Sequence, residues 1–130
     1  MTKLIDNKFT CCSAKNVTYC PVEATIYLIG GKYKALILWK LTMGTHRFSE
    51  LRKEVPLATP KMLTQQLREL EKEGLINRKV YPVVPPKVEY SLTLLGQSIK
   101  PILEAMYKWG SSYLNQQGLV VNCSMQPFSK

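Results

Sequence analysis

The clearest hydrophobic pattern in the chain lies between Thr59 and Gly74. At about 100° per residue, Leu63, Leu67 and Leu70 fall on one side of a helix, as in an amphipathic segment with one packed face. Thr59 can cap the first helical N–H groups, and the proline that follows it has no N–H to leave without a partner. Gly74 is a typical helix end. The pattern therefore predicts one helix with clearly marked ends.

The opposite side of this helix is cationic. Three basic side chains and an amide form a narrow stripe, and two acids lie on its flanks without neutralising its centre: Lys61, Gln65, Arg68 and Lys72, with Glu69 and Glu71 beside them. On an isolated helix such a face would be read as a solvated surface. Whether this face binds a polyanion is therefore judged from the neighbouring segments.

Those neighbours complete a recognisable unit. Residues 47–55 form a shorter predicted helix, and Pro56 starts the turn that separates it from the longer one, which gives the spacing of a helix-turn-helix. Residues 75–81 and 88–92 are predicted strands, the second alternating cleanly between apolar and polar positions. A proline-bearing loop flanked by basic residues joins the strands. A hairpin in this position, after a recognition helix, is a wing.

The rest of the chain is mostly helical. We expect helices over residues 21–29 and 34–42, and a long helix from a Thr93 cap to about Asn115 with a kink at Pro101. The predicted fold class is mainly α with a small β-hairpin (α+β). Its expected organisation is an N-terminal arm (1–18), one winged helix-turn-helix domain with an extra terminal helix (19–117) and a C-terminal tail (118–130).

The apolar stripe of the last helix exceeds what one small core needs, which favours a homodimer. Together with the first helix it supplies the candidate interface residues Ile26, Ile29, Ile99, Ile102, Leu103, Met106 and Trp109. The alternative is that the helix folds back on its own domain.

The net charge of the chain indicates which class of partner it binds. The chain carries 18 Lys and Arg against 9 Asp and Glu, a formal charge of +9, and twelve of those cations lie between Lys32 and Lys87 against five acids. A basic footprint that coincides with a helix-turn-helix and wing favours nucleic acid over a membrane surface. No targeting segment or bilayer-spanning run is visible, so we expect a cytoplasmic protein with its four cysteines as thiols.

Other classes of function find little support. Asp6 and His46 are the only residues of their types and cannot assemble an enzyme site, and no cofactor is expected. The possible metal ligands Cys11, Cys12, Cys20, His46 and Cys123 lack the spacing of a structural zinc site, so no metal ligands are assigned. A small apolar ligand or a metal at the dimer interface remains an alternative way in which the protein could be controlled, besides thiol chemistry at a cysteine.

A series of ordered motifs also carries a family resemblance. The motifs are Cys20-Pro21-Val22-Glu23, Ile29 to Lys34, Arg47 to Arg52, Met62 to Glu71, Tyr81 to Leu92, Leu95-Gly96 and Trp109-Gly110. Together they resemble the HxlR family of bacterial transcription regulators over roughly Cys20 to Gly110. Tyr33 stands where many members have tryptophan. The resemblance implies a winged-helix homodimer that binds operator DNA, as a repressor or an activator.

On double-stranded DNA, two recognition helices about 34 Å apart would read an inverted repeat. The expected base contacts come from Lys61, Thr64, Gln65 and Arg68; the expected phosphate contacts come from Ser49 and Thr59; and Arg78, Lys79 and Lys87 on the wing would meet the backbone or minor groove.

Cys20 is the candidate sensing residue. It directly precedes the first helix, where the positive end of the helix dipole favours a thiolate, although Glu23 one turn on opposes this. A cysteine at such a boundary can equally be a small packed hydrophobe. The resemblance favours sensing, because it implies in several members a response to electrophiles, quinones, aldehydes or oxidants through a cysteine at this place.

Overall fold

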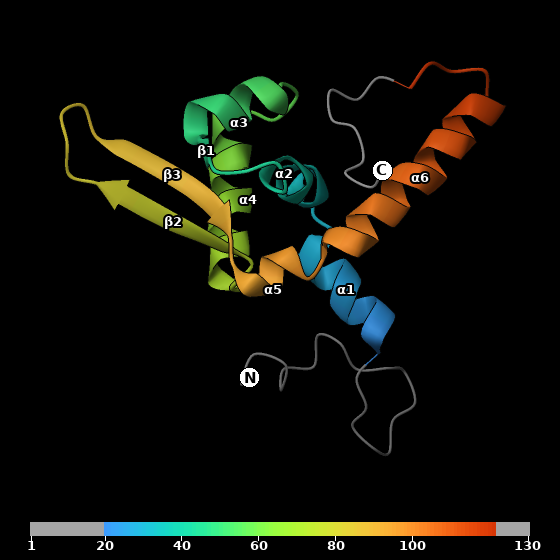
Figure 1. The fold of residues 1–130 in the computed structure, drawn as a ribbon, viewed down its shortest axis with the longest axis horizontal. Coiled ribbons are helices and arrows are strands. Elements are labelled where there is room, and N and C mark those ends of the chain that lie inside the picture. Colours follow the sequence, from blue (N-terminus) through green and yellow to red (C-terminus); the bar gives the residue numbers. More distant parts are fainter. Residues whose placement is uncertain (1–19, 122–130) are drawn as a thin grey trace.

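The structure, a computed structural model, describes residues 20–121. Its elements in chain order are α1 (Pro21–Ile29), α2 (Lys34–Leu41), β1 (His46–Arg47), α3 (Phe48–Glu54), α4 (Pro60–Lys72), β2 (Ile76–Tyr81), β3 (Lys87–Leu92), α5 (Leu94–Gln97) and α6 (Lys100–Gln116). The β2–β3 hairpin extends from one side of the helices, and α6 extends from the other (Figure 1). The mainly helical fold with a small sheet confirms the predicted class.

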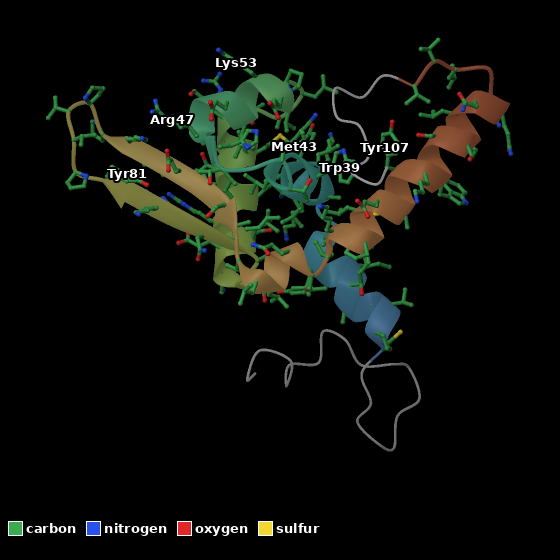
Figure 2. The ribbon with its side chains drawn as sticks, viewed as in Figure 1. Trp39, Met43, Arg47, Lys53, Tyr81 and Tyr107 are labelled. Carbon is green, nitrogen blue, oxygen red and sulfur yellow. The ribbon has the colours of Figure 1, made fainter. Side chains whose placement is uncertain are left out.

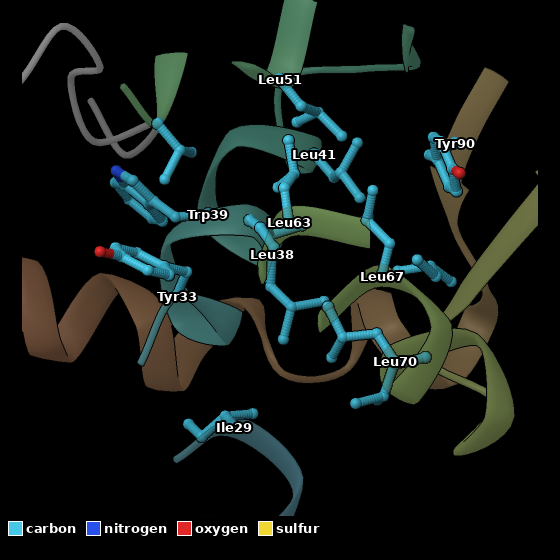
Figure 3. Close-up of a cluster of buried hydrophobic side chains, with 14 of the residues drawn as sticks. Ile29, Tyr33, Leu38, Trp39, Leu41, Leu51, Leu63, Leu67, Leu70 and Tyr90 are labelled. Carbon is cyan, nitrogen blue, oxygen red and sulfur yellow. The ribbon is translucent and has the colours of Figure 1, made fainter. Parts of the chain in front are cut away.

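The core is built from the inner faces of α2, α3 and α4 (Figure 3). Leu63, Leu67 and Leu70 on α4 are at most 1% exposed, and they belong to one cluster with Leu38 of α2 and Leu51 of α3. The spacing of the three α4 leucines follows the helical period, so burying them turns the polar side of α4 outward. The core thus fixes which face of the recognition helix reaches solvent.

The sheet has one strand more than the predicted hairpin. The strand order is β1-β3-β2, all antiparallel, with His46 opposite Tyr90 and Arg47 opposite Glu89. Arg47, predicted to start a helix, instead lies in β1, and α3 begins at Phe48. Two residues are too few to show alternation, and this strand exists through its pairing with β3.

The predicted long C-terminal helix is wrong in its continuity. Thr93 does cap a helix, since its Oγ1 accepts a hydrogen bond from the Gly96 N–H at 3.0 Å, but that helix, α5, ends at Gln97. After a turn at Ser98 and Ile99 a new helix, α6, begins, with Pro101 in its first turn. A proline there removes no helical hydrogen bond, so it marks a start and not a kink.

Several predictions concern residues outside the described part of the chain. The N-terminal arm, Cys11, Cys12, Cys123 and most of the C-terminal tail belong to this group. The proposed domain limits at residues 19 and 117 stay predictions.

Candidate nucleic-acid interface

The recognition helix α4 has the ends that its sequence predicts. Thr59 Oγ1 accepts a hydrogen bond from the Met62 N–H at 3.1 Å, Pro60 is the first helical residue, and Gly74 has a φ of +83°. A positive φ is readily adopted only by glycine, so this residue can reverse the chain into β2. The ends of α4 are therefore fixed by local chemistry as well as by the core.

Four predicted base-contacting residues line one surface hollow. It has a volume of about 470 Å³ and is formed by Phe48, Pro60, Lys61, Thr64, Gln65 and Arg68. Lys61, Gln65 and Arg68 are exposed. Thr64 is half-buried and its hydroxyl donates to the Pro60 carbonyl oxygen at 2.8 Å, so this side chain remains able to accept but its proton is engaged within the helix.

A second hollow, of about 270 Å³, lies between α4 and the wing. It is lined by Thr64, Arg68, Glu71, Arg78 and Tyr90. Arg68 lines both hollows, so its guanidinium can serve a base edge on one side or a phosphate on the other. Arg78, on β2, faces the recognition helix from the wing.

The other face of the wing concentrates its lysines around one tyrosine. Lys79 Nζ lies 5.0 Å and Lys87 Nζ 4.8 Å from the centre of the Tyr81 ring, within the range of cation–π contact. The two lysines are predicted DNA contacts, whereas Tyr81 is not among the predicted site residues. Its place between Lys79 and Lys87 in the sequence is the signal that could have indicated it. Figure 2 shows Tyr81 near the far end of the hairpin.

The wing acid Glu89 is held ionised by Lys87 and Tyr81. Desolvation raises its pKa, but hydrogen bonds from Lys87 and Tyr81 outweigh that effect, so the pKa lies below its ordinary value of 4.5. Lys87 Nζ lies 3.3 Å from Glu89 Oε2, and Lys79 is opposite Glu89 in the ladder. Lys79 and Lys87 thus share one ring, and Lys87 also pairs with the Glu89 carboxylate, which gives the wing a cationic surface of defined shape.

The phosphate candidates lie at the two helix starts. Ser49 is exposed in the first turn of α3, where Glu50 Oε1 accepts a hydrogen bond from the Arg47 N–H at 2.7 Å. Thr59 is exposed at the start of α4. Ser49 and Thr59 are therefore both accessible to solvent at the starts of the two helices of the helix-turn-helix.

Comparison with known proteins identifies the family to which this helix-turn-helix fold belongs. A family model described as HxlR-like helix-turn-helix matches residues 28–118. The chain is 53% identical over 94 residues to a Bacillus subtilis (strain 168) protein described as the uncharacterized HTH-type transcriptional regulator YdeP, covering 72% of this chain and 73% of that protein. The chain belongs to the HxlR family. It is a transcriptional regulator of the HxlR type.

Solved structures of two other regulators are also similar. A putative HTH-type transcriptional regulator, ytcD, is 54% identical with a TM-score of 0.71, covering 74% of this chain and 98% of the other. The redox regulator HypR is similar in two forms: the oxidised form is 50% identical (TM-score 0.69, covering 72% and 96%), and the reduced form is 46% identical (TM-score 0.72, covering 76% and 98%).

In this HxlR regulator Cys20 is the N-cap residue of α1. Its backbone is extended (φ −87°, ψ 119°), its carbonyl accepts from the Ala24 N–H at 2.9 Å, and the residue is half-buried. Further along α1, the Tyr27 hydroxyl donates to Glu73 Oε2 at 3.2 Å, at the C-terminal end of α4. The helix that follows Cys20 therefore has a direct polar contact with the C-terminal end of the recognition helix.

The predicted dimer residues divide into two groups. Ile29, Ile99 and Leu103 are at most 8% exposed and belong to the core of their own chain, so their assignment to a dimer surface is corrected. The other four lie exposed on α1 and α6: Ile26, Ile102, Met106 and Trp109. The sequence pattern identified one apolar stripe, but it could not show which part of that stripe the chain itself covers.

An apolar groove of about 200 Å³ separates α2 from α6. It is lined by Ala35, Leu36, Trp39, Leu103, Met106 and Tyr107. The Trp39 and Tyr107 rings stack with centroids 5.8 Å apart, and Figure 2 shows both residues between the two helices. The small apolar ligand considered from the sequence was expected at the dimer interface, whereas this groove lies between two helices of one chain.

The potential metal-ligating residues are dispersed within residues 20–121. No group of three or more His, Cys, Asp or Glu residues in this range could hold a metal ion. The imidazole of His46 contacts the Gly44 carbonyl oxygen at 2.9 Å and Glu54 Oε1 at 3.4 Å. None of the helices in the same range is long and apolar enough to cross a bilayer.

Proposed function

We propose that this regulator binds operator DNA as a homodimer, with α4 of each protomer in the major groove of one half-site of an inverted repeat. The observation that carries the proposal is the hollow in which Lys61, Gln65 and Arg68 converge on the exposed face of α4. The excess of nine positive charges would bring the protein to DNA whatever its sequence. Base contacts from α4 would then select the site, and wing cations would hold the backbone.

The contrast between Arg68→Ala and Lys79→Ala tests this division of roles. Arg68→Ala should cost about 1–3 kcal/mol of binding and relax one position of the site, because arginine can grip guanine through two hydrogen bonds. Lys79→Ala should weaken binding to all sequences alike and reduce the salt dependence, since it removes a phosphate contact. Competition binding with base-substituted duplexes measures both effects. Unchanged operator preference in Arg68→Ala would refute its role as a base reader.

The exposed apolar side chains of α1 and α6 support the dimer. Trp109 is 71% exposed and stacks on Tyr113 with ring centroids 5.6 Å apart, and Ile26 is 60% exposed. Rings and branched side chains so exposed at two places are typical of a surface that a partner covers.

We expect Trp109→Asp to raise the dimer dissociation constant by roughly 10-fold or more, because large aromatic residues dominate interface energies. Leu57→Asp is the matched control, since Leu57 is 84% exposed in the turn before α4. Sedimentation velocity across a concentration series reads the constant. A monomeric wild type, or equal effects of the two variants, would contradict a dimer built on α6.

We infer that Cys20 is the sensing residue. A quinone would add to its thiolate and form a carbon–sulfur bond, whereas diamide would take two electrons and two protons from a pair of thiols and leave a disulfide. Either change at the start of α1 could reach α4 through the contact between Tyr27 and Glu73. The similarity to HypR, a redox regulator solved in oxidised and reduced forms, supports this inference.

Cys20→Ser should bind DNA like the wild type under reducing conditions but lose the response of DNA affinity to diamide and quinones. Serine keeps the size of the side chain and lacks the nucleophilic sulfur. Fluorescence anisotropy with each protein, before and after treatment, measures the response. An identical response in Cys20→Ser would exclude this cysteine as the sensor.

The apolar groove between α2 and α6 supports a second candidate for control, a small apolar ligand. Binding there would depend on Trp39 and Tyr107 and not on thiols. A compound that raises the melting temperature equally in the wild type and in a cysteine-free variant would favour ligand control over thiol control.

A further inference from the structure

The carboxylate of Glu69 joins the scaffold of the domain to a predicted base-reading residue. Its Oε1 lies 2.7 Å from Lys34 Nζ at the start of α2, and its Oε2 accepts a hydrogen bond from Gln65 Nε2 at 3.3 Å. Both oxygens of this one carboxylate therefore have partners, one on each side. Gln65 itself is exposed and lines the hollow on the reading face of α4.

The Lys34 end of this connection is held firmly. The Lys34 side chain is only 12% exposed, whereas that of Glu69 is 42% exposed. The turn that precedes α2 packs closely on α4, since a Cβ added to Gly31 would lie 2.6 Å from Gln66 Oε1 and 2.9 Å from Lys34 Cδ. The hydrogen bond from Lys34 is the largest effect on Glu69, whose pKa lies below its ordinary value. Glu69 is thus an ionised group in a fixed position.

An ionised carboxylate can hold an amide in one orientation only. A carboxylate accepts hydrogen bonds and donates none, so the NH₂ group of Gln65 must face Glu69, and a flipped amide would set oxygen against oxygen. The held amide keeps one N–H and its carbonyl oxygen for other partners. One donor beside one acceptor is the pattern that the major-groove edge of adenine requires, with its N7 acceptor and N6 donor.

We propose that Glu69 is a positioning residue that fixes the amide of Gln65 and thereby sets a preference for adenine at one position of each half-site. Lys34 anchors the carboxylate and couples this position to α2. The proposal rests on the proposed operator binding. It adds a residue that acts through Gln65, outside the set of predicted DNA contacts.

The test uses a duplex selected by the wild-type protein from a random library, together with duplexes substituted at each base pair of one half-site. The base pair read by Gln65 is the one whose discrimination falls in Gln65→Ala. Glu69→Gln should lower discrimination at that same base pair by roughly 3- to 10-fold, because an amide at position 69 can donate as well as accept and so allows both orientations of Gln65. Discrimination at the other base pairs should not change.

Three comparisons separate positioning from a general effect of charge or stability. Glu73→Gln removes the same charge from the end of the same helix and should leave discrimination at the Gln65 base pair unchanged. Lys34→Met should lower discrimination at that base pair while replacing a nearly buried ammonium with an apolar side chain, which tests the anchor without leaving Glu69 uncharged. In the Gln65→Ala background, Glu69→Gln should have no further effect on discrimination.

The outcomes are distinct. Equal loss at every base pair, an undiminished effect of Glu69→Gln in the Gln65→Ala background, or unchanged discrimination in a Glu69→Gln protein that binds the selected site would each overturn the positioning role. Failure of the wild-type protein to select any inverted repeat would instead refute the proposed function.

Discussion

Leu67→Ala should lower the free energy of unfolding by about 2–5 kcal/mol, the usual range for emptying a leucine site in a packed core. Leu67 is 1% exposed and lies on the inner face of α4 among the buried side chains of α2 and α3 (Figure 3). The loss combines the removed apolar contact with a cavity under the recognition helix. Urea unfolding at a fixed protein concentration measures it, and the m-value reports whether the folded state stays compact.

Leu57→Ala is the control for this change, because Leu57 is 84% exposed. Its unfolding free energy should stay within about 0.5 kcal/mol of the wild type, as for most surface substitutions. Similar losses in the two variants would mean that Leu57 is buried by a partner or that α4 is not seated as described.

Gly96→Ala should lower the free energy of unfolding by more than about 2 kcal/mol, the upper part of the range for overpacked sites. A Cβ at this buried glycine of α5 would overlap the Leu75 carbonyl oxygen, a backbone atom that cannot rotate away. The Thr93 N–H donates to that same oxygen at 3.1 Å, and Thr93 Oγ1 donates to the Gly74 carbonyl oxygen at 2.6 Å. The substitution would therefore separate α5 from the end of the recognition helix.

Gly110→Ala, on α6, should instead raise the free energy of unfolding. A Cβ there meets no atom of residues 20–121 within 4 Å outside its own helical backbone, so alanine should gain about 0.5–1 kcal/mol from its better helix propensity. Thermal unfolding of the two variants side by side gives the comparison. A stable Gly96→Ala protein would show that α5 does not pack against Leu75 in this way.

The well-marked parts of the fold were predictable because their signals are local. Thr59, Pro60 and Gly74 act within one turn of the ends of α4, and β3 was indicated by its alternating apolar residues, of which Tyr90 is buried. The missed features depend on distant partners. The strand β1 exists only through β3, and whether Pro101 kinks a helix or starts one is decided by the packing of α5.

The candidate site shows the same division. The exposed stripe of Lys61, Gln65 and Arg68 follows from helical periodicity, so its placement agreed with the sequence. The contact of Glu69 with Lys34 could not be predicted from helical periodicity. Periodicity placed that acid on the flank of the stripe, but its contact with Lys34 spans two helices and requires the packed structure.

The geometry of a dimer on an inverted repeat is the central claim, and a binding titration over altered half-site spacings tests it most directly. The selected duplex is compared with one that has a scrambled half-site and one with about 5 extra base pairs between the half-sites, half a turn of DNA. We predict tight binding to the selected duplex only, with both changes reducing affinity to near the non-specific level. Equal affinity for all three duplexes would contradict a dimer that reads two half-sites through α4.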